Sequence, residues 1–292
     1  MILIDANQVF FSSILSSKDP LQEDLIRHII TNALRNNISK FKEYNNPIIC
    51  LDSKNYWRKE VFPHYKAHRK ETRDKSPLDW NLIFKVLNQY KDDLKEHFPY
   101  KTIEVDGAEA DDIIGTLAPR FAQHEKVIII SSDQDFLQLQ KYPNVKQYNP
   151  SLNVFLTSKD PNKDLKEKII KGDRGDGIPS ILSANDTFIT KTRQKPITQK
   201  FLQESLEKDP KEYFQDNVYQ NYLRNQTLID FNYIPEDIKT NIINEYNIPK
   251  TGTKNTLYKY LVNYKLINLV ECINDFWVIE AEEESTTDWP KG

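Results

Sequence analysis

The sequence predicts an α/β fold in which helices flank a mostly parallel central sheet and a helical region follows at the C-terminal end. Short β-branched runs alternate with segments of helical spacing, which is the pattern of strands joined by crossover helices. The run of Val127, Ile128, Ile129 and Ile130 indicates a strand buried on both faces, as in a parallel sheet. Strand patterns cease near residue 180, where we place the start of the helical region.

The expected elements follow one another along a chain of 292 residues, enough for one large core and a smaller one. Strands are expected at residues 2–4, 47–51, 101–105, 127–130, 145–148 and 154–156. Helical spacing occurs at residues 21–44, 78–97, 108–117, 165–171, 197–206, 212–228, 238–246 and 256–269. Residues 54–75 have weak periodicity and form a long insertion, which in a compact domain is usually functional.

Composition excludes several classes of protein. No apolar run approaches the length of a membrane span and no basic leader precedes the first strand, so we expect an intracellular, cytoplasmic protein with no membrane partner. Cys50 and Cys272 are far apart and no Cys/His pair has zinc spacing, which argues against disulfides and thiolate metal sites. Neither of the phosphate-binding motifs G-x-x-x-x-G-K-[ST] and G-x-G-x-x-G occurs, so any phosphate must be bound by side chains or metal ions.

Acidic residues occur at four junctions between a predicted strand and the following segment. They are Asp5, Asp52, Glu109, Asp111, Asp112, Asp133 and Asp135. Parallel strands with right-handed crossovers would bring these carboxylates to one edge of the sheet, where they would repel one another unless cations bind. Oxygen ligands without His or Cys select Mg²⁺ or Mn²⁺, and a two-metal site of this kind fits phosphodiester hydrolysis. The alternative for each acid alone is a helix cap or a first-turn residue.

Basic residues concentrate in the insertion at 54–75, although the net charge of the whole chain is −3. Eight Lys or Arg stand there against three acids, and Tyr56, Trp57, Phe62 and Tyr65 lie among them. Cations for phosphates and aromatic rings for bases are typical of proteins that bind single-stranded nucleic acid. A solvated charged loop is the alternative.

Four stretches show a resemblance to a known family. They are Pro63-His-Tyr65-Lys66-Ala-His-Arg69, Glu109-Ala-Asp111-Asp112, Ser131-Ser-Asp133-Gln-Asp135 and Lys171-Gly-Asp173-Arg-Gly-Asp176. With these motifs the chain resembles the flap endonuclease/5′-nuclease family, and within it the ribonuclease H type of T-even bacteriophages. The resemblance implies a PIN-like 5′-nuclease core and, if the chain is phage-encoded, a place in the host cytoplasm.

The resemblance also implies roles for individual residues. Asp5, Asp52, Glu109, Asp111 and Asp133 would surround a first Mg²⁺, and Asp135, Asp173 and Asp176 a second, with Asp112 beside them and Mn²⁺ as a possible substitute. Residues 54–75 would form a helical arch over the 5′ single strand, in which Lys66 and Arg69 contact the scissile phosphate. Tyr65 would be available for stacking on a base.

The implied function is that of a Mg²⁺-dependent 5′-to-3′ exonuclease and flap endonuclease. Its substrates would be DNA duplexes and RNA–DNA hybrids with a 5′ end or flap, and it would remove RNA primers during DNA replication as a monomer. One rival is a Mg²⁺-dependent phosphohydrolase, which would need Asp-x-Asp at the first strand where this chain has Asp5-Ala-Asn7. The other is a non-catalytic DNA-junction binder, which would be expected to have lost one or more of the acids.

The predicted organisation is a catalytic domain at 1–180, a helical duplex-binding domain at 181–278 and a disordered acidic tail at 279–292. The C-terminal region would contact a single-stranded-DNA-binding protein, as the resemblance implies. The glycine-rich hairpin of the family is replaced by Ile178-Pro-Ser-Ile-Leu-Ser-Ala-Asn185, which argues against a monovalent-ion site. Nucleic-acid contacts are assigned to Arg58, Lys59, Tyr65, Lys66, Arg69, Lys70, Lys191, Arg193, Lys195 and Lys200.

Overall fold

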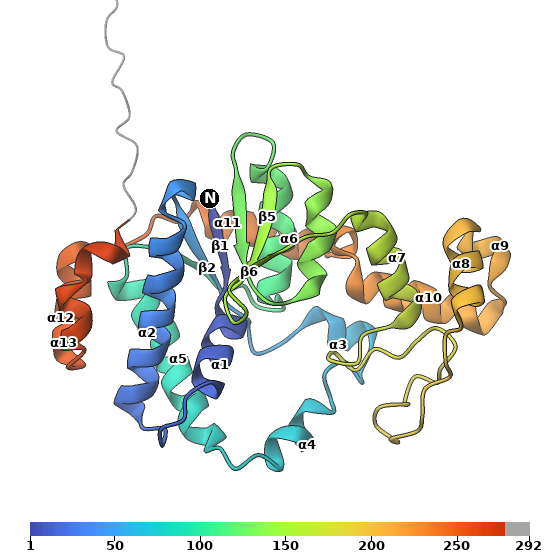
Figure 1. Cartoon of the computed structure of the whole chain (residues 1–292), viewed down its shortest axis with the longest axis horizontal. Coiled ribbons are helices and arrows are strands. Elements are labelled where there is room, and N and C mark those ends of the chain that lie inside the picture. Colours follow the sequence, from blue (N-terminus) through green and yellow to red (C-terminus); the bar gives the residue numbers. More distant parts are fainter. Residues whose placement is uncertain (278–292) are drawn as a thin grey trace, which may run out of the picture.

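In the computed structural model, which describes residues 1–277, the described chain forms a six-stranded sheet of order β3-β2-β1-β4-β5-β6 (Figure 1). The strands are β1 (Ile2–Asp5), β2 (Pro47–Cys50), β3 (Lys101–Ile103), β4 (Val127–Ile130), β5 (Val145–Asn149) and β6 (Val154–Leu156). Strands β1 to β5 are parallel to their neighbours, whereas β6 is antiparallel to β5. The prediction of a mostly parallel sheet is therefore confirmed.

The order of the strands reverses at the centre of the sheet. Strand β1 pairs with β2 on one side and with β4 on the other, so that Ile4 lies opposite both Ile49 and Ile130. The chain leaves β1 and β4 toward different sides of the sheet, which opens a crevice at their carboxyl ends. The acids that follow these two strands are thus placed where parallel sheets bind their ligands.

Helices cover both faces of the sheet and extend beyond its carboxyl edge (Figure 1). One face carries α1 (Ala6–Leu15), α2 (Glu23–Lys40), η1 (Lys42–Tyr44), α5 (Trp80–His97), α12 (Lys254–Asn263), α13 (Ile267–Glu271) and η4 (Ile273–Phe276). The other carries α6 (Ala110–Phe121), η2 (Gln134–Lys141), η3 (Phe231–Tyr233) and α11 (Glu236–Asn247). The remaining helices are α3 (Trp57–Val61), α4 (Arg69–Asp74), α7 (Pro161–Lys171), α8 (Gln199–Glu207), α9 (Pro210–Tyr213) and α10 (Asp216–Ile229).

Most predicted helices are present, with shifted ends. Helix α1 was not predicted, and it begins because the side chain of Asp5 caps it by accepting a hydrogen bond from the backbone N–H of Gln8. The predicted helix at 212–228 is divided into α9 and α10, since Phe214 and Gln215 are extended between them. The segment after Asp135 is a 3₁₀ helix, η2, capped by the side chain of Asp133.

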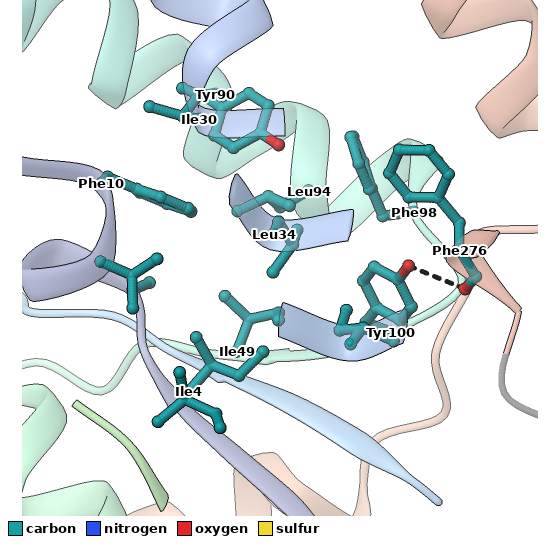
Figure 2. Packing of buried hydrophobic residues seen from close by; sticks show 14 of the residues in the cluster. Ile4, Phe10, Ile30, Leu34, Ile49, Tyr90, Leu94, Phe98, Tyr100 and Phe276 are labelled. Atoms are coloured by element: carbon teal, nitrogen blue, oxygen red, sulfur yellow. Dashed lines mark hydrogen bonds between the residues drawn. The ribbon is translucent and has the colours of Figure 1, made fainter. Parts of the chain in front are cut away.

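Alternate residues of each strand build the core on the two faces of the sheet. Ile2 and Ile4 point into one hydrophobic cluster, and Leu3 points into the other. Figure 2 shows part of the first cluster, in which residues of α2 and α5 lie over the strands and the Tyr100 hydroxyl donates to the backbone oxygen of Phe276 at 2.7 Å. Residues from both ends of the described chain therefore share one core.

The packing does not follow the domain boundary predicted at residue 180. Leu257, Tyr260 and Leu261 of α12 lie in the first cluster with the strands, and Ile238 of α11 lies in the second. A further cluster combines Phe62 and Tyr65 with apolar residues of α7, α8 and α10. The core of the sheet thus includes the helices after residue 230, because short strands need apolar cover on both faces. The acidic tail at 279–292 lies outside the described residues.

The predicted insertion at 54–75 is helical as expected, with α3 and α4 joined by tight turns. Phe62 and Tyr65 are buried in the further cluster, so the base of the insertion is anchored and not a free loop. Among residues 1–277, no helix is long and apolar enough to cross a membrane.

The shared core predicts that a substitution in α12 destabilises the whole fold. Leu261→Ala removes a fully buried side chain and should lower the free energy of unfolding by about 2–4 kcal/mol in one cooperative transition. The neighbouring Val262→Ala, at a position that is 40% exposed, should change it by less than about 0.5 kcal/mol. Urea denaturation followed by circular dichroism measures both, and a separate early transition in Leu261→Ala would show an independent C-terminal domain instead.

Candidate active site

The first acid of the site is Asp5, at the end of β1. Its Oδ1 accepts from the backbone N–H of Gln8 at 3.2 Å, and its Oδ2 accepts from the Ser131 hydroxyl at 2.8 Å. Ser131 follows β4, so this bond joins the ends of the two strands at the reversal point of the sheet. Gln8 is in turn hydrogen-bonded through its side chain to Ser132.

Asp52 and Glu109 bring the next two junctions to the same edge. The Asp52 carboxylate accepts from the Asn7 side chain at 2.6 Å and from the backbone N–H of Ala110 at 2.8 Å. The end of β2 is thereby tied both to α1 and to the first turn of α6. Glu109 is the residue at which α6 begins, and its carboxylate is almost completely buried.

Glu109 is surrounded by groups from the arch, the name used from here for residues 54–75. Its Oε2 accepts from the Tyr65 hydroxyl at 2.9 Å and from Arg58 at 3.0 Å, and its Oε1 lies 2.5 Å from Lys66 Nζ. The backbone of Lys66 has a positive φ of 56°, which turns the chain so that its N–H donates to the Asp176 carbonyl at 2.8 Å. The arch is therefore fastened to the acidic edge of the sheet.

Asp173 and Asp176 lie in a tight loop after α7. Asp173 pairs with Ile178 in a two-way backbone bridge, and its side chain accepts from the backbone N–H of Asp176 at 3.1 Å. Asp176 accepts from the Tyr65 hydroxyl at 2.9 Å and lies 2.6 Å from Arg69. Gly177 has a φ of +72°, and a Cβ there would lie 2.9 Å from the His68 ring, so the loop passes directly beneath the arch.

A lysine that sequence reasoning missed lies between two of the acids. Lys168 of α7 pairs with Asp135, and its Nζ is 2.7 Å from Asp173. The sequence did not indicate that Lys168 contacts the acids, because it belongs to a helix of ordinary amphipathic spacing. The signal that would have found it is its distance of five residues from Asp173, which puts both at the same end of α7.

Burial, together with repulsion among the acids, raises several of their pKa values. Burial and the neighbouring Asp52 raise the pKa of Asp5 to about 7. Burial and then Asp133 raise the pKa of Asp111 well above its ordinary value. Burial also raises that of Asp133, where the negative charges of Asp176 and Asp173 add to the shift and Lys168 opposes it. Acids from the three central strand ends and from the loop after α7 therefore influence one another.

Cations offset part of this repulsion. Burial works against the ionised form of Asp176, yet Lys66 and Arg69 hold its pKa below the ordinary value. Lys66 lies between Glu109 and Asp176, and Lys168 lies between Asp135 and Asp173. Within residues 1–277, no group of three or more His, Cys, Asp or Glu side chains is arranged to hold a metal ion as it stands.

Some predicted site residues have a different place from the one expected. Asp112 is fully buried, and its Oδ2 accepts from Trp57 Nε1 at 3.2 Å, from Arg58 Nη1 at 2.9 Å and from the backbone N–H of Glu109. Its Oδ1 forms an ion pair with Arg58 Nη2 at 2.8 Å. Arg58 is 3% exposed and also donates to the Leu228 carbonyl, so its guanidinium lies inside the protein. Tyr65 is 1% exposed and its ring is not free to stack on a base. The reason is that the arch needs a buried anchor.

Other predicted contacts lie on the surface. Lys59, Lys70 and Arg69 are exposed on the arch, and Arg69 keeps 45% of its side chain accessible while it pairs with Asp176. Lys191, Arg193 and Lys195 are exposed on the irregular segment between α7 and α8, and Lys200 is exposed in the first turn of α8. Lys191 pairs with Glu71 of α4 at 2.6 Å, which joins this segment to the arch.

Comparison with known proteins identifies the family. Residues 1–170 match the family model of the 5′-3′ exonuclease, N-terminal resolvase-like domain, and residues 159–276 match the model of T4 RNase H, C terminal. The chain belongs to the 5′-3′ exonuclease family and carries the C-terminal region of the ribonuclease H type. The predicted family and enzyme class, a 5′-nuclease, are confirmed.

Individual relatives agree with this assignment. Ribonuclease H of Enterobacteria phage T4 is 34% identical over 289 residues, which cover 94% of this chain and 95% of that protein. A 5′-3′ exonuclease of Buchnera aphidicola subsp. Schizaphis graminum is 34% identical over 48% of this chain and 50% of that protein. The solved bacteriophage T5 flap endonuclease, a complex with DNA and metal ions, shares the fold with a TM-score of 0.56 and 17% identity, covering 85% of this chain and 99% of that one.

The raised pKa of Asp5 predicts that the site destabilises the metal-free protein above neutral pH. A carboxyl group with a higher pKa in the folded than in the unfolded chain binds protons preferentially when folded, so stability rises as the pH falls from about 7 toward 4. In EDTA at pH 8, Asp5→Asn should be more stable than wild type by about 2–4 kcal/mol, because Asn keeps the helix cap without the charge.

Chemical denaturation of both proteins across this pH range checks the sign. The advantage of Asp5→Asn should disappear near pH 4, where the wild-type carboxyl is protonated. An Asp5→Asn variant that is less stable than wild type at pH 8 in EDTA would contradict the account of charge repulsion at this position.

Proposed function

We propose that this chain is a Mg²⁺-dependent 5′-to-3′ exonuclease and flap endonuclease. Its substrates are DNA duplexes and RNA–DNA hybrids with a 5′ end or flap, and its role is the removal of RNA primers during replication. The observation that carries the proposal is the gathering of acids from four strand junctions and the loop after α7 at one edge, with Lys66 and Arg69 among them. The relatives named above carry exonuclease, flap endonuclease and ribonuclease H activities in their names.

The donor set fits two Mg²⁺ ions, with Mn²⁺ as a substitute. Every predicted ligand is a carboxylate, and hard oxygen ligands without His or Cys suit these ions. Asp5, Asp52, Glu109, Asp111 and Asp133 would hold one ion, and Asp135, Asp173 and Asp176 the other. The raised pKa values of Asp5, Asp111 and Asp133 support this, since bound cations would relieve the repulsion. Bound metal supplies an activated water and stabilises the charge of the leaving oxygen.

Asp112 acts as a positioning residue in this proposal. Its bonds to Trp57 and Arg58 fix the base of the arch against the first turn of α6. The N–H of Glu109 donates to the same carboxylate at 2.9 Å, so Asp112 also orients the neighbouring predicted ligand. It needs no direct contact with metal for this role.

Lys66 and Arg69 are the residues that bind the scissile phosphate. In the structure they pair with Glu109 and Asp176, which are predicted metal ligands. Once these carboxylates are neutralised, the ammonium and guanidinium groups are free to face a phosphate at the same place. Arg69 offers two donors on a planar group, which suits the charge that develops on phosphate oxygens.

Duplex binding falls to exposed cations on both sides of the acidic edge. Lys59 and Lys70 lie on the arch, while Lys191, Arg193, Lys195 and Lys200 lie on and after the segment that follows α7. Such residues neutralise backbone phosphates without reading sequence. The enzyme acts as a monomer, and its C-terminal region contacts a single-stranded-DNA-binding protein.

Cleavage should depend on metal and on Asp133. A 5′-labelled flap and an RNA–DNA hybrid should be cut in Mg²⁺ and not in EDTA, and Asp133→Asn should lower the rate at least about 100-fold. Asn preserves the cap of η2, so the variant should keep its fold. Asp237→Asn, at an exposed acid on α11, is the matched control and should cut normally. Undiminished cleavage by Asp133→Asn would refute the mechanism.

Charge reversal after α7 should weaken duplex binding. Arg193→Glu with Lys195→Glu should reduce affinity for a DNA duplex and lower the slope of log K against log salt by about one for each lost phosphate contact. Fluorescence anisotropy in EDTA at several salt concentrations measures both quantities. The matched control is Arg120→Glu with Lys126→Glu, two exposed cations at the opposite end of the sheet. Equal losses in the two double variants would show a general charge effect.

A further inference from the structure

A cavity lies beside the acidic edge, between the arch and the helices of the first cluster. Its volume is about 560 Å³, within the range of roughly 300–1,000 Å³ typical of small-molecule sites. Asn7 and Asp52 line it on the side of the acids, and His68 and Arg69 line it on the side of the arch. Residues of α1, α4 and α5 line it, and Figure 1 shows α4 beyond the end of α5. The cavity is therefore continuous with the proposed active site.

Aromatic rings form the far wall of the cavity. Phe11 of α1 and Trp80 and Phe84 of α5 are mutual neighbours, with ring centroids 5.8 to 6.1 Å apart. Phe84 remains 37% exposed although it is a large apolar residue. The three rings are therefore not completely covered by the core, and the exposed part of Phe84 is open to a ligand.

Cations accompany the rings. Arg73 lies with its guanidinium carbon 5.7 Å from the centroid of Phe84, and Lys54 lines the same cavity. Neither side chain forms an ion pair with any residue of 1–277. Arg69, which pairs with Asp176, lies at the boundary with the acids. The wall thus offers aromatic faces together with unpaired positive charge.

We propose that this cavity binds a nucleobase of the single-stranded 5′ segment, stacked against Trp80 and Phe84, with the adjoining phosphate near Arg73 and Lys54. Aromatic faces and cations with few acids are the composition that holds single-stranded nucleic acid without reading its sequence. The inference rests on the proposed nuclease function and deepens it, since it names where the 5′ segment lies. Tyr65, the stacking residue expected from sequence, is buried elsewhere.

A purely apolar occupant, such as a side chain of a partner protein, fits the cavity less well. It would use the rings but leave Arg73 and Lys54 without a counter-charge beside the bound group. A nucleotide satisfies both parts, and the strand that carries it already has to reach Asp52 at the edge of the cavity. The position of the cavity therefore favours the substrate itself.

The experiment measures binding of 5′-flap duplexes in EDTA, where a metal-dependent nuclease cannot cut. One flap carries normal nucleotides, and a series of others carries a single abasic residue at each successive position. For wild type, one or two positions nearest the junction should show roughly 5- to 100-fold weaker binding when the base is missing. Phe84→Ala should bind the intact flap as weakly as wild type binds those abasic flaps, and should show no further loss with them.

Two further variants separate stacking from damage to the fold. Phe84→Tyr keeps the ring and should restore discrimination against the abasic flaps. Tyr258→Ala removes a ring that is 48% exposed on α12, far from the cavity, and should behave as wild type. Thermal melts should show that each variant is folded, as expected for substitutions at exposed positions.

The outcomes distinguish the pocket from the enzyme. If wild type cuts flaps in Mg²⁺ but binds intact and abasic flaps equally, or if Phe84→Ala keeps its discrimination, the base pocket is refuted and the proposed function stands. If wild type neither binds nor cuts any flap, both proposals fail. Loss of discrimination in Phe84→Ala with rescue in Phe84→Tyr supports the pocket.

Discussion

Carboxylates at the carboxyl ends of β1, β2 and β4 repel one another, and much of the surrounding chain limits that repulsion. Lys66 and Lys168 each lie between a pair of acids, and Arg69 pairs with Asp176. Hydrogen bonds from Asn7 and Ser131 hold Asp52 and Asp5 in fixed directions. An arrangement of like charges this close is tolerated only because cations, from the protein or from solution, share the site.

The same charges connect the arch to the sheet. Phe62 and Tyr65 anchor the chain between α3 and α4 in the further cluster. Tyr65 and Lys66 also reach the acids at the start of α6 and in the loop after α7. Arch position and carboxylate ionisation are thus parts of one electrostatic arrangement. Whatever neutralises Glu109 and Asp176 also weakens the contacts that hold the arch down, so ligand entry and arch freedom are linked by the same ion pairs.

Sequence patterns predict the sheet and the acids well because both depend on local order. The four β-branched residues at 127–130 predict a buried strand from their own sequence alone. An acid that directly follows the strand must then lie at its carboxyl end. Whether a polar residue is buried, by contrast, depends on elements that are distant in the sequence. Arg58 and Tyr65 occur in the same basic, aromatic segment as Lys59 and Lys70, yet two face inward and two face solvent. The choice depends on α10, which supplies the Leu228 carbonyl 170 residues later. Helices α11 and α12 were likewise assigned to a separate domain because nothing in their spacing shows which surface they cover.

The packing of α12 and η4 against the strands has a consequence for the order of folding during synthesis. Translation releases β1, β2 and α5 long before Leu261 and Phe276, which complete the cluster around Phe98 and Tyr100. Until then one face of the sheet lacks part of its apolar cover. The first cluster is therefore completed only after α12 and η4 have been synthesised.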